Sequence, residues 1–273
     1  MKKIFAGVIF PLLVISFSCI SSCSSCKNRT AAKQQKNTEK KEIQGQIESK
    51  VYPLPTSAEV IKMLTDFEVG YSIGITNPVA NTKKYFSSPV RAINLGVFGA
   101  DLSYATLYNQ QQEVINYLNA IRELANELNM SKVYNEELYP KIKQNYDNRD
   151  ELVKILQTTF NDTYAYLDDN DEQPLALLVV GGAWVEGMYL TTQVSDAAYQ
   201  FEGISKVLLE QKKSLDTYMD ITKPYLTDPS VGDFVKRLDP VNKVYGGIGT
   251  SLTEQNIKDI TKVIVDVREQ IVK

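Results

Sequence analysis

The sequence contains no histidine, and its only three cysteines, Cys19, Cys23 and Cys26, lie close to its N-terminus. These absences exclude a Ser-His-Asp or Cys-His catalytic triad, a zinc site of histidine and cysteine ligands, and a histidine proton switch. They also exclude a disulfide framework in the later, folded part of the chain. No other catalytic motif is recognisable. We therefore expect no metal and no cofactor, and a protein that is not an enzyme is favoured.

The charges are unevenly distributed along the chain. Residues 51–273 hold 30 acidic and 21 basic side chains, whereas residues 27–50 hold seven basic and three acidic ones. Phosphate contacts need a basic surface, so the acidic body argues against nucleic acid as a partner. The basic stretch is rich in Lys, Gln, Asn and Thr and has no aromatic residue, so it cannot offset its ordering entropy by burial. We interpret residues 23–52 as a flexible basic tether.

The N-terminus has the pattern of a targeting segment. Lys2 and Lys3 precede an apolar stretch at residues 4–17, which is as long as a signal-peptide core and too short to cross a bilayer comfortably. Residues 20–23 then read Ile-Ser-Ser-Cys, an aliphatic residue and two small residues before a cysteine. This arrangement resembles a bacterial lipoprotein precursor, in which such a motif is the lipobox and its cysteine becomes the acylated N-terminus.

The resemblance implies a signal peptide at residues 1–22 and a lipid, such as palmitate, on Cys23. Cys19 is the alternative acceptor, although the bulky Phe17 stands where a small residue is usual. An ordinary signal peptide with incidental cysteines is the other interpretation, but no later cysteine explains their presence as oxidised pairs. No acidic cluster closely follows Cys23, whereas surface-exported lipoproteins of some Gram-negative groups carry one. We therefore expect a protein anchored to the outer membrane by its lipid and facing the periplasm.

Helical signals dominate the remainder of the chain. Apolar residues recur at spacings of three, four and seven, and no segment alternates with period two over a convincing length. Asn148 and Asp228 are predicted N-caps, and Ser251 begins a predicted capping box. The apolar stripe over residues 107–128 predicts one long amphipathic helix. We predict that residues 53–273 form one compact all-α domain, a bundle of about seven or eight helices around an apolar glycine-rich central helix.

That central segment, residues 174–190, is apolar on every side and carries a single charge, Glu186. A helix of this kind either spans a membrane or forms the centre of a helical globule. Its uninterrupted apolar run, residues 175–185, is well below the ~20 residues that a membrane span needs, so we predict a central helix. Gly181 and Gly182 each weaken a helix by about 1 kcal/mol relative to alanine, and we expect a close approach of neighbouring helices to compensate.

A second glycine-bearing stretch, residues 94–108, matches this segment at an offset of 85 positions. Asp101 then corresponds to Glu186 and Tyr104 to Tyr189, so each stretch has one acid in apolar surroundings and a tyrosine one helical turn further on. Duplication of a helical hairpin would produce this similarity, and so would chance, because an offset of 86 fits nearly as well. Together with the lipobox, both stretches resemble uncharacterised helical lipoproteins of Bacteroidota-type bacteria. That resemblance implies location and fold, and carries no activity.

The two acids have two interpretations. Burying a carboxylate costs several kcal/mol unless it is paired, so tyrosine hydroxyls, backbone N–H groups or a cation such as Arg91 would hold both acids internally. Alternatively, they face one polar pocket beside Trp184 and bind a cationic or hydroxyl-rich ligand. The candidate ligand-binding residues are therefore Asp101, Tyr104, Trp184, Glu186 and Tyr189.

Three function classes are compatible with the sequence. The favoured one is a membrane-anchored envelope lipoprotein that binds or scaffolds a protein or a small polar ligand. The second is an enzyme acting on glycans or peptidoglycan, because two carboxylates at a fixed separation suffice there without histidine. The third is a purely structural envelope component. Acids close together in a solvent-open cleft would favour the enzyme, whereas closed packing around them would favour a binding or structural role.

Overall fold

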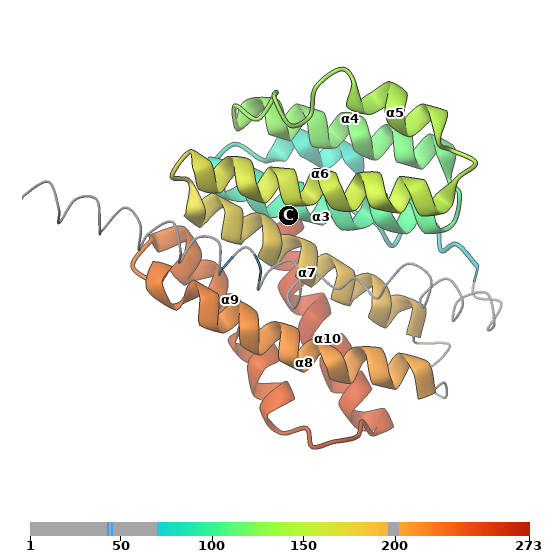
Figure 1. The fold of residues 1–273 in the computed structure, drawn as a ribbon. Helices are drawn as coiled ribbons and strands as arrows, with labels where there is room; N and C mark the ends of the chain where they lie inside the picture. The colour runs from blue at the N-terminus through green and yellow to red at the C-terminus, as the bar shows by residue number, and fades with distance from the viewer. Residues whose placement is uncertain (1–42, 44, 46–69, 196–201) are drawn as a thin grey trace, which may run out of the picture. The chain divides into compact units, whose positions relative to one another are not determined.

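The computed structural model of the chain describes Ile43, Gly45 and residues 70–195 and 202–273. Within these residues there are eight α-helices of seven or more residues and no β-strand, so the all-α prediction is confirmed (Figure 1). The helices are α3 (Ser88–Leu107), α4 (Gln111–Glu127), α5 (Leu138–Gln144), α6 (Arg149–Asp169), α7 (Gln173–Ser195), α8 (Glu202–Thr222), α9 (Pro229–Gly246) and α10 (Glu254–Val272). Two 3-10 helices, η2 (Val79–Lys84) and η3 (Lys223–Tyr225), complete the described elements.

Helix α7 runs through the middle of these helices. It packs against α3 and α6 on one side and against α8 and α9 on another, and α10 contacts both α7 and α3 (Figure 1). Among the described helices, α7 has the length and hydropathy of a membrane span over Gln173–Gln193, but 83% of that window is buried inside the fold. The prediction of a buried central helix is therefore confirmed.

The backbones of α3 and α7 approach each other closely at two glycines. A Cβ atom built on Gly96 would overlap the carbonyl oxygen of Val179, and one built on Gly182 would overlap the carbonyl oxygen of Ile93. The C-terminal parts of both helices also meet, because Asp101 lies beside Glu186 and a cluster joins Ala100 and Tyr104 to Leu190, so α3 and α7 run parallel. Gly181 faces aromatic side chains of α8 and α9 that a Cβ atom would also overlap. The close approach expected at Gly181 and Gly182 is confirmed.

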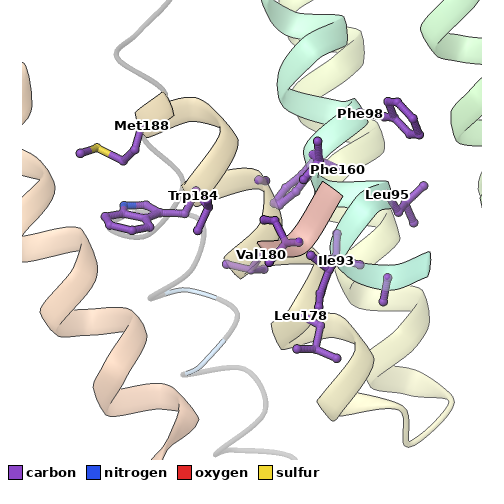
Figure 2. Packing of buried hydrophobic residues seen from close by; sticks show 14 of the residues in the cluster. Ile93, Leu95, Phe98, Phe160, Leu178, Val180, Trp184 and Met188 are labelled. Carbon is purple, nitrogen blue, oxygen red and sulfur yellow. The ribbon is translucent and has the colours of Figure 1, made fainter. Parts of the chain in front are cut away.

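Most of the buried apolar side chains form one core around this helix pair. Figure 2 shows Ile93 of α3 and Leu178 of α7 within it, together with Phe160 of α6. A smaller cluster lies at the C-terminal ends of α3 and α7. It is built on Ala100, Tyr104 and Leu190, with the partly buried Tyr71, Ile75, Tyr108 and Tyr189 packed against it. The small cluster contains two of the candidate tyrosines.

The single long helix expected over residues 107–128 is wrong, because the chain breaks into α3 and α4. Asn109 adopts the left-handed conformation (φ 55°), and the Gln110 amide donates to the Ala105 carbonyl at 2.9 Å. This is the hydrogen bond of a Schellman motif, which ends a helix by satisfying a terminal carbonyl. An apolar stripe continues across such a break and does not reveal it.

Helices α4 and α6 end in the same way. Asn129 (φ 60°) follows α4, and the amide after it donates to the Ala125 carbonyl at 2.8 Å. Asp171 (φ 63°) follows α6, and the next amide donates to the Leu167 carbonyl at 2.8 Å. Asn and Asp are the residues other than glycine that tolerate this conformation best. Three helices thus end with the same motif, a left-handed residue followed by an amide that bonds a carbonyl of the last turn.

The helix starts were predicted more successfully. The Asn148 side chain accepts the Glu151 amide at 3.1 Å, and the Asp228 side chain accepts two amides of the first turn of α9, so both N-caps are confirmed. The capping box at Ser251 is wrong. It lies two residues later, where Thr253 and Asn256 bond each other's backbone amides. Both positions have a hydroxyl residue followed three residues later by a polar one, and the helix begins at the position nearer to the buried stripe of α10.

Several predictions fall on residues outside the described ones. They are the signal peptide at residues 1–22, the acceptor Cys23 with its alternative Cys19, and the tether at residues 23–52. The start of the helical domain at residue 53 also lies there. All of these remain predictions from the sequence.

Candidate functional site

A short irregular segment, residues 71–78, leads into η2 and packs against the C-terminal ends of α3 and α7; we call it the strap. The Ser72 amide donates to the Tyr104 hydroxyl at 3.0 Å, and Gly74 supplies a turn with a φ of 87°. The ring of Tyr71 stacks on that of Tyr104, with centroids 5.2 Å apart. The strap is thereby held over the two candidate acids, Asp101 and Glu186.

The carboxyl group of Asp101 is completely buried, with 0% of the residue exposed. Its Oδ2 atom accepts the backbone N–H of Asn77 in the strap at 3.1 Å. Its Oδ1 atom receives no N–H or O–H donor from the described residues. As an ionised carboxylate, Asp101 therefore has one oxygen that accepts a hydrogen bond and one that accepts none from the described residues.

Glu186 is also completely buried, and it is held by Arg268 of α10. The Arg268 Nε donates to Oε2 and its Nη2 donates to Oε1, both at 3.0 Å, which is a bidentate pair. Nη2 also donates to the Ile75 carbonyl of the strap at 3.3 Å, and the guanidinium carbon lies 4.3 Å from the ring centroid of Tyr189. Arg268 thus connects α7, α10 and the strap.

The two carboxyl groups lie within hydrogen-bonding reach of each other. Burial, followed by the neighbouring charge of Glu186, raises the pKa of Asp101 well above its ordinary value. Burial also raises the pKa of Glu186, but Arg268 acts in the opposite direction there. The proton is therefore held more strongly at Asp101.

A chain of hydrogen bonds extends this cluster to the end of α10. The Asn77 side chain donates to the Tyr85 hydroxyl at 3.0 Å, which in turn donates to the Val272 carbonyl at 3.2 Å. The Asn94 side chain of α3 donates to the Ile271 carbonyl at 2.8 Å. Terminal carbonyls of a helix lack intrahelical partners, so these side chains satisfy groups that would otherwise be orphaned.

The structure brings four of the five candidate residues to this region. Asp101 and Glu186 meet directly, Tyr189 lies under Arg268, and Tyr104 binds the strap. Trp184 is not part of the cluster. Its indole N–H donates to Gln211 of α8 at 3.1 Å, and Figure 2 shows its ring on the side of α7 away from Ile93 and Phe160. A pocket shared by the acids and Trp184 is therefore not formed.

The cation and the amide that hold the acids were missed from the sequence. Arg91, the suggested cation, pairs with Glu127 at 3.0 Å instead. Arg268 could have been found, because it is spaced four residues from Ile264 and three from Ile271 on the buried stripe of α10. Asn77 lies in an irregular segment and contributes a backbone group, so no residue pattern marks it.

Chemically, the cluster is closed. Both carboxyls are buried and are engaged by groups of the same chain. Within residues 70–195 and 202–273, no group of three or more His, Cys, Asp or Glu side chains is placed to hold a metal ion. The arrangement connects helices and strap, and it presents neither acid to solvent.

The fold and the cluster together define an all-α domain with a buried carboxyl–guanidinium network. No protein-family model matches the chain, and no curated protein or solved structure matches it significantly. Function is therefore inferred from the residues and their geometry.

Proposed function

We propose that this chain is a membrane-anchored envelope lipoprotein whose helical domain binds or scaffolds a protein or a small polar ligand. The lipobox-like sequence at residues 20–23 supports the anchor. The acidic body supports a partner other than nucleic acid, because it lacks the basic surface that phosphates need. The proposed location is the periplasmic face of the outer membrane.

The observation that carries the proposal is the closed packing around Asp101 and Glu186. Both residues are 0% exposed, and Asn77 and Arg268 bind them from within the fold. A glycosidase needs both carboxyls at the scissile bond of its substrate. The burial of this pair therefore favours a binding role over a carboxylate-dependent enzyme.

Two exposed apolar side chains favour binding over a purely structural role. Ile73 is 89% exposed at the turn of the strap, and Phe86 is 80% exposed just before α3. Single exposed apolar residues are ordinary on protein surfaces. Here both belong to the segment that precedes the first long described helix, and Ile73 lies two residues from the half-buried Tyr71. They are the positions at which we expect a partner to be contacted.

Photo-crosslinking in the cell envelope tests this function. A photoreactive amino acid at position 73 or 86 of the full chain should give a discrete adduct with one partner. The same amino acid at position 154, where the exposed Lys154 stands on α6, is the matched control and should give none. The absence of adducts at both apolar positions, or identical adducts at all three, would contradict the binding role.

A digestion assay separates this role from the enzyme. Purified mature protein is incubated with peptidoglycan sacculi, and soluble fragments are measured for the wild type, Asp101→Asn and Glu186→Gln. We expect no fragments above the buffer blank from any of them. Fragments released by the wild type and lost in both variants would replace the binding proposal with the enzyme.

The anchor is tested at Cys23. Cys23→Ser should move the protein from the membrane fraction to the soluble fraction, or leave it as an uncleaved precursor, because the acyl acceptor is lost. Cys19→Ser is the matched control and should remain in the membrane fraction with an acylated N-terminus. Intact-mass analysis that finds an unmodified N-terminus elsewhere would contradict the anchor.

A further inference from the structure

The charges of the buried cluster do not balance if every group is ionised. Asp101 and Glu186 would contribute two negative charges, and Arg268 contributes one positive charge. Burying an uncompensated charge is expensive, and like charges within contact distance disfavour joint ionisation. One proton on the carboxyl pair would make the cluster neutral.

The hydrogen-bond geometry identifies where that proton belongs. Both Glu186 oxygens accept from Arg268, and Asp101 Oδ2 accepts from the Asn77 amide. Asp101 Oδ1 is the remaining oxygen, buried and without a donor, and its carboxyl lies within reach of Glu186. A proton on Oδ1 converts it from an unsatisfied acceptor into a donor to the Glu186 carboxylate. The Oδ1 atom then takes part in a hydrogen bond, and the cluster carries no net charge.

We propose that Asp101 carries a proton at neutral pH and donates it in a hydrogen bond to Glu186, and that this bond is a pH-sensitive latch that holds the strap against α3, α7 and α10. The latch includes Arg268, which binds Glu186 and the Ile75 carbonyl, and the Asn77 amide, which binds Asp101. When Asp101 ionises, its O–H bond breaks and the proton leaves to solvent. The cluster then carries one excess negative charge, and the strap opens.

The other groups around Asp101 do not supply a competing cation. Glu186 and Tyr189 face it from α7, Arg268 from α10, Tyr117 from α4 and Tyr71 from the strap. Burial, with nearby acids, raises the pKa of Tyr71 to about 12, so this phenol is neutral throughout the range in which the latch operates. Burial raises the pKa values of the other two tyrosines as well. Arg268 is therefore the only cation among these groups.

The protonation state is tested directly by NMR of the full mature chain. With ¹³Cγ-labelled aspartate, Asp101 is assigned as the resonance missing from the Asp101→Asn spectrum. We expect it to keep the shift of a neutral carboxyl at neutral pH, which is well above the pKa of aspartate in model peptides. A change of the Asp101 resonance to the shift of a carboxylate at acidic pH would overturn the shared proton.

The latch is tested by hydrogen exchange at the Asn77 amide. In the wild type its protection factor should fall by about tenfold per pH unit once opening is coupled to the loss of one proton. Asp101→Asn keeps an N–H donor to Glu186 and cannot ionise, so its protection should not change with pH. The Leu152 amide, which donates to the Asn148 carbonyl at the start of α6, should behave alike in both proteins.

Each outcome of the exchange experiment has a defined meaning. Loss of Asn77 protection in the wild type alone supports the latch. Parallel loss in the wild type and Asp101→Asn, or no loss in either while Asp101 titrates, overturns it. If Asp101→Asn is poorly folded, the wild-type NMR titration and the wild-type comparison of the Asn77 and Leu152 amides still decide the question.

Discussion

At the scale of single residues, Arg268 depends on one partner. Its guanidinium group lies against Glu186 and the Tyr189 ring, and only a small part of it reaches solvent. Removal of one member of a buried ion pair leaves an uncompensated charge, which costs about 3–5 kcal/mol. We predict that Glu186→Gln lowers the free energy of unfolding by up to about this amount, since Asp101 can then ionise and offset part of the Arg268 charge. Urea denaturation at neutral pH measures the loss.

The matched control uses an exposed pair of the same type. Asp233 and Arg237 form an i, i+4 pair on α9, and Asp233→Asn should cost less than about 1 kcal/mol because solvent screens such pairs. Asp101→Asn should also cost little, since the amide preserves the hydrogen bond to Glu186. Similar losses for Glu186→Gln and Asp233→Asn would contradict the assignment of Arg268 as a buried, partner-dependent cation.

Two glycines in α3 provide a second residue-scale prediction. Gly96→Ala places a methyl group on the Val179 carbonyl oxygen and should cost about 3 kcal/mol, the upper end for overpacked cores. Gly99 lies three residues later in the same helix with nothing within 4 Å of a built Cβ, so Gly99→Ala should stabilise by about 1 kcal/mol through helix propensity. Thermal melts of both variants give the comparison, and equal effects would contradict the close approach.

At the scale of elements, the backbone conformation at helix ends contributes to stability, as the packing of helix faces does. Asn129 is exposed and adopts a φ of 60° after α4. Alanine tolerates this conformation poorly, so Asn129→Ala should destabilise by about 1 kcal/mol. Glycine adopts it freely, so Asn129→Gly should be neutral or slightly stabilising. Chemical denaturation of the two variants measures the order of stability, and an alanine variant at least as stable as the glycine variant would contradict the assigned conformation.

The same elements show what the sequence could predict about the fold. Apolar stripes report which face of a helix is buried, so the helical class, the central α7 and the stripe of α10 followed from spacing alone. A stripe contains no information about backbone conformation between its members. The break at Asn109 was therefore missed, and so was the choice of Thr253 over Ser251 as the N-cap.

The candidate site was predictable to a similar depth. Asp101 and Glu186 stood out because each is a lone acid in an apolar stretch, and the structure places them together. Trp184 was grouped with them by proximity in sequence, but two positions along a helix correspond to nearly opposite faces. The position of Arg268 on the apolar stripe of α10 indicated that it is buried. No pattern indicated the Asn77 amide, because a backbone group of an irregular segment can be located only from the fold.

At the scale of the whole molecule, the cluster sets a dependence of stability on pH. The pKa of Asp101 is raised in the folded protein by burial and by Glu186, so the folded state retains a proton that the unfolded chain loses in the ordinary acidic range. Its contribution to the free energy of unfolding is present below the unfolded pKa. It declines, by up to about 1.4 kcal/mol per pH unit, as pH rises toward the folded pKa.

This contribution can be isolated by difference. Urea denaturation of the wild type and Asp101→Asn is measured at a series of pH values from acidic to mildly alkaline. Surface carboxylates affect both proteins equally, so the stability of the wild type relative to Asp101→Asn should decrease with rising pH. A difference that is constant or increases with pH would contradict a raised pKa at Asp101.

The parallel pairing of α3 with α7 has a consequence for the order in which the chain folds. Gly96 and Gly182, at which the two helices approach each other closely, are 86 positions apart, with α4, α5 and α6 between them. During synthesis, α3 therefore emerges long before its main partner and meets only α4 as a local neighbour. Contacts of such high sequence separation slow folding, because the loop between them must close first. The refolding rate of the chain should therefore be limited by the docking of α7 against α3.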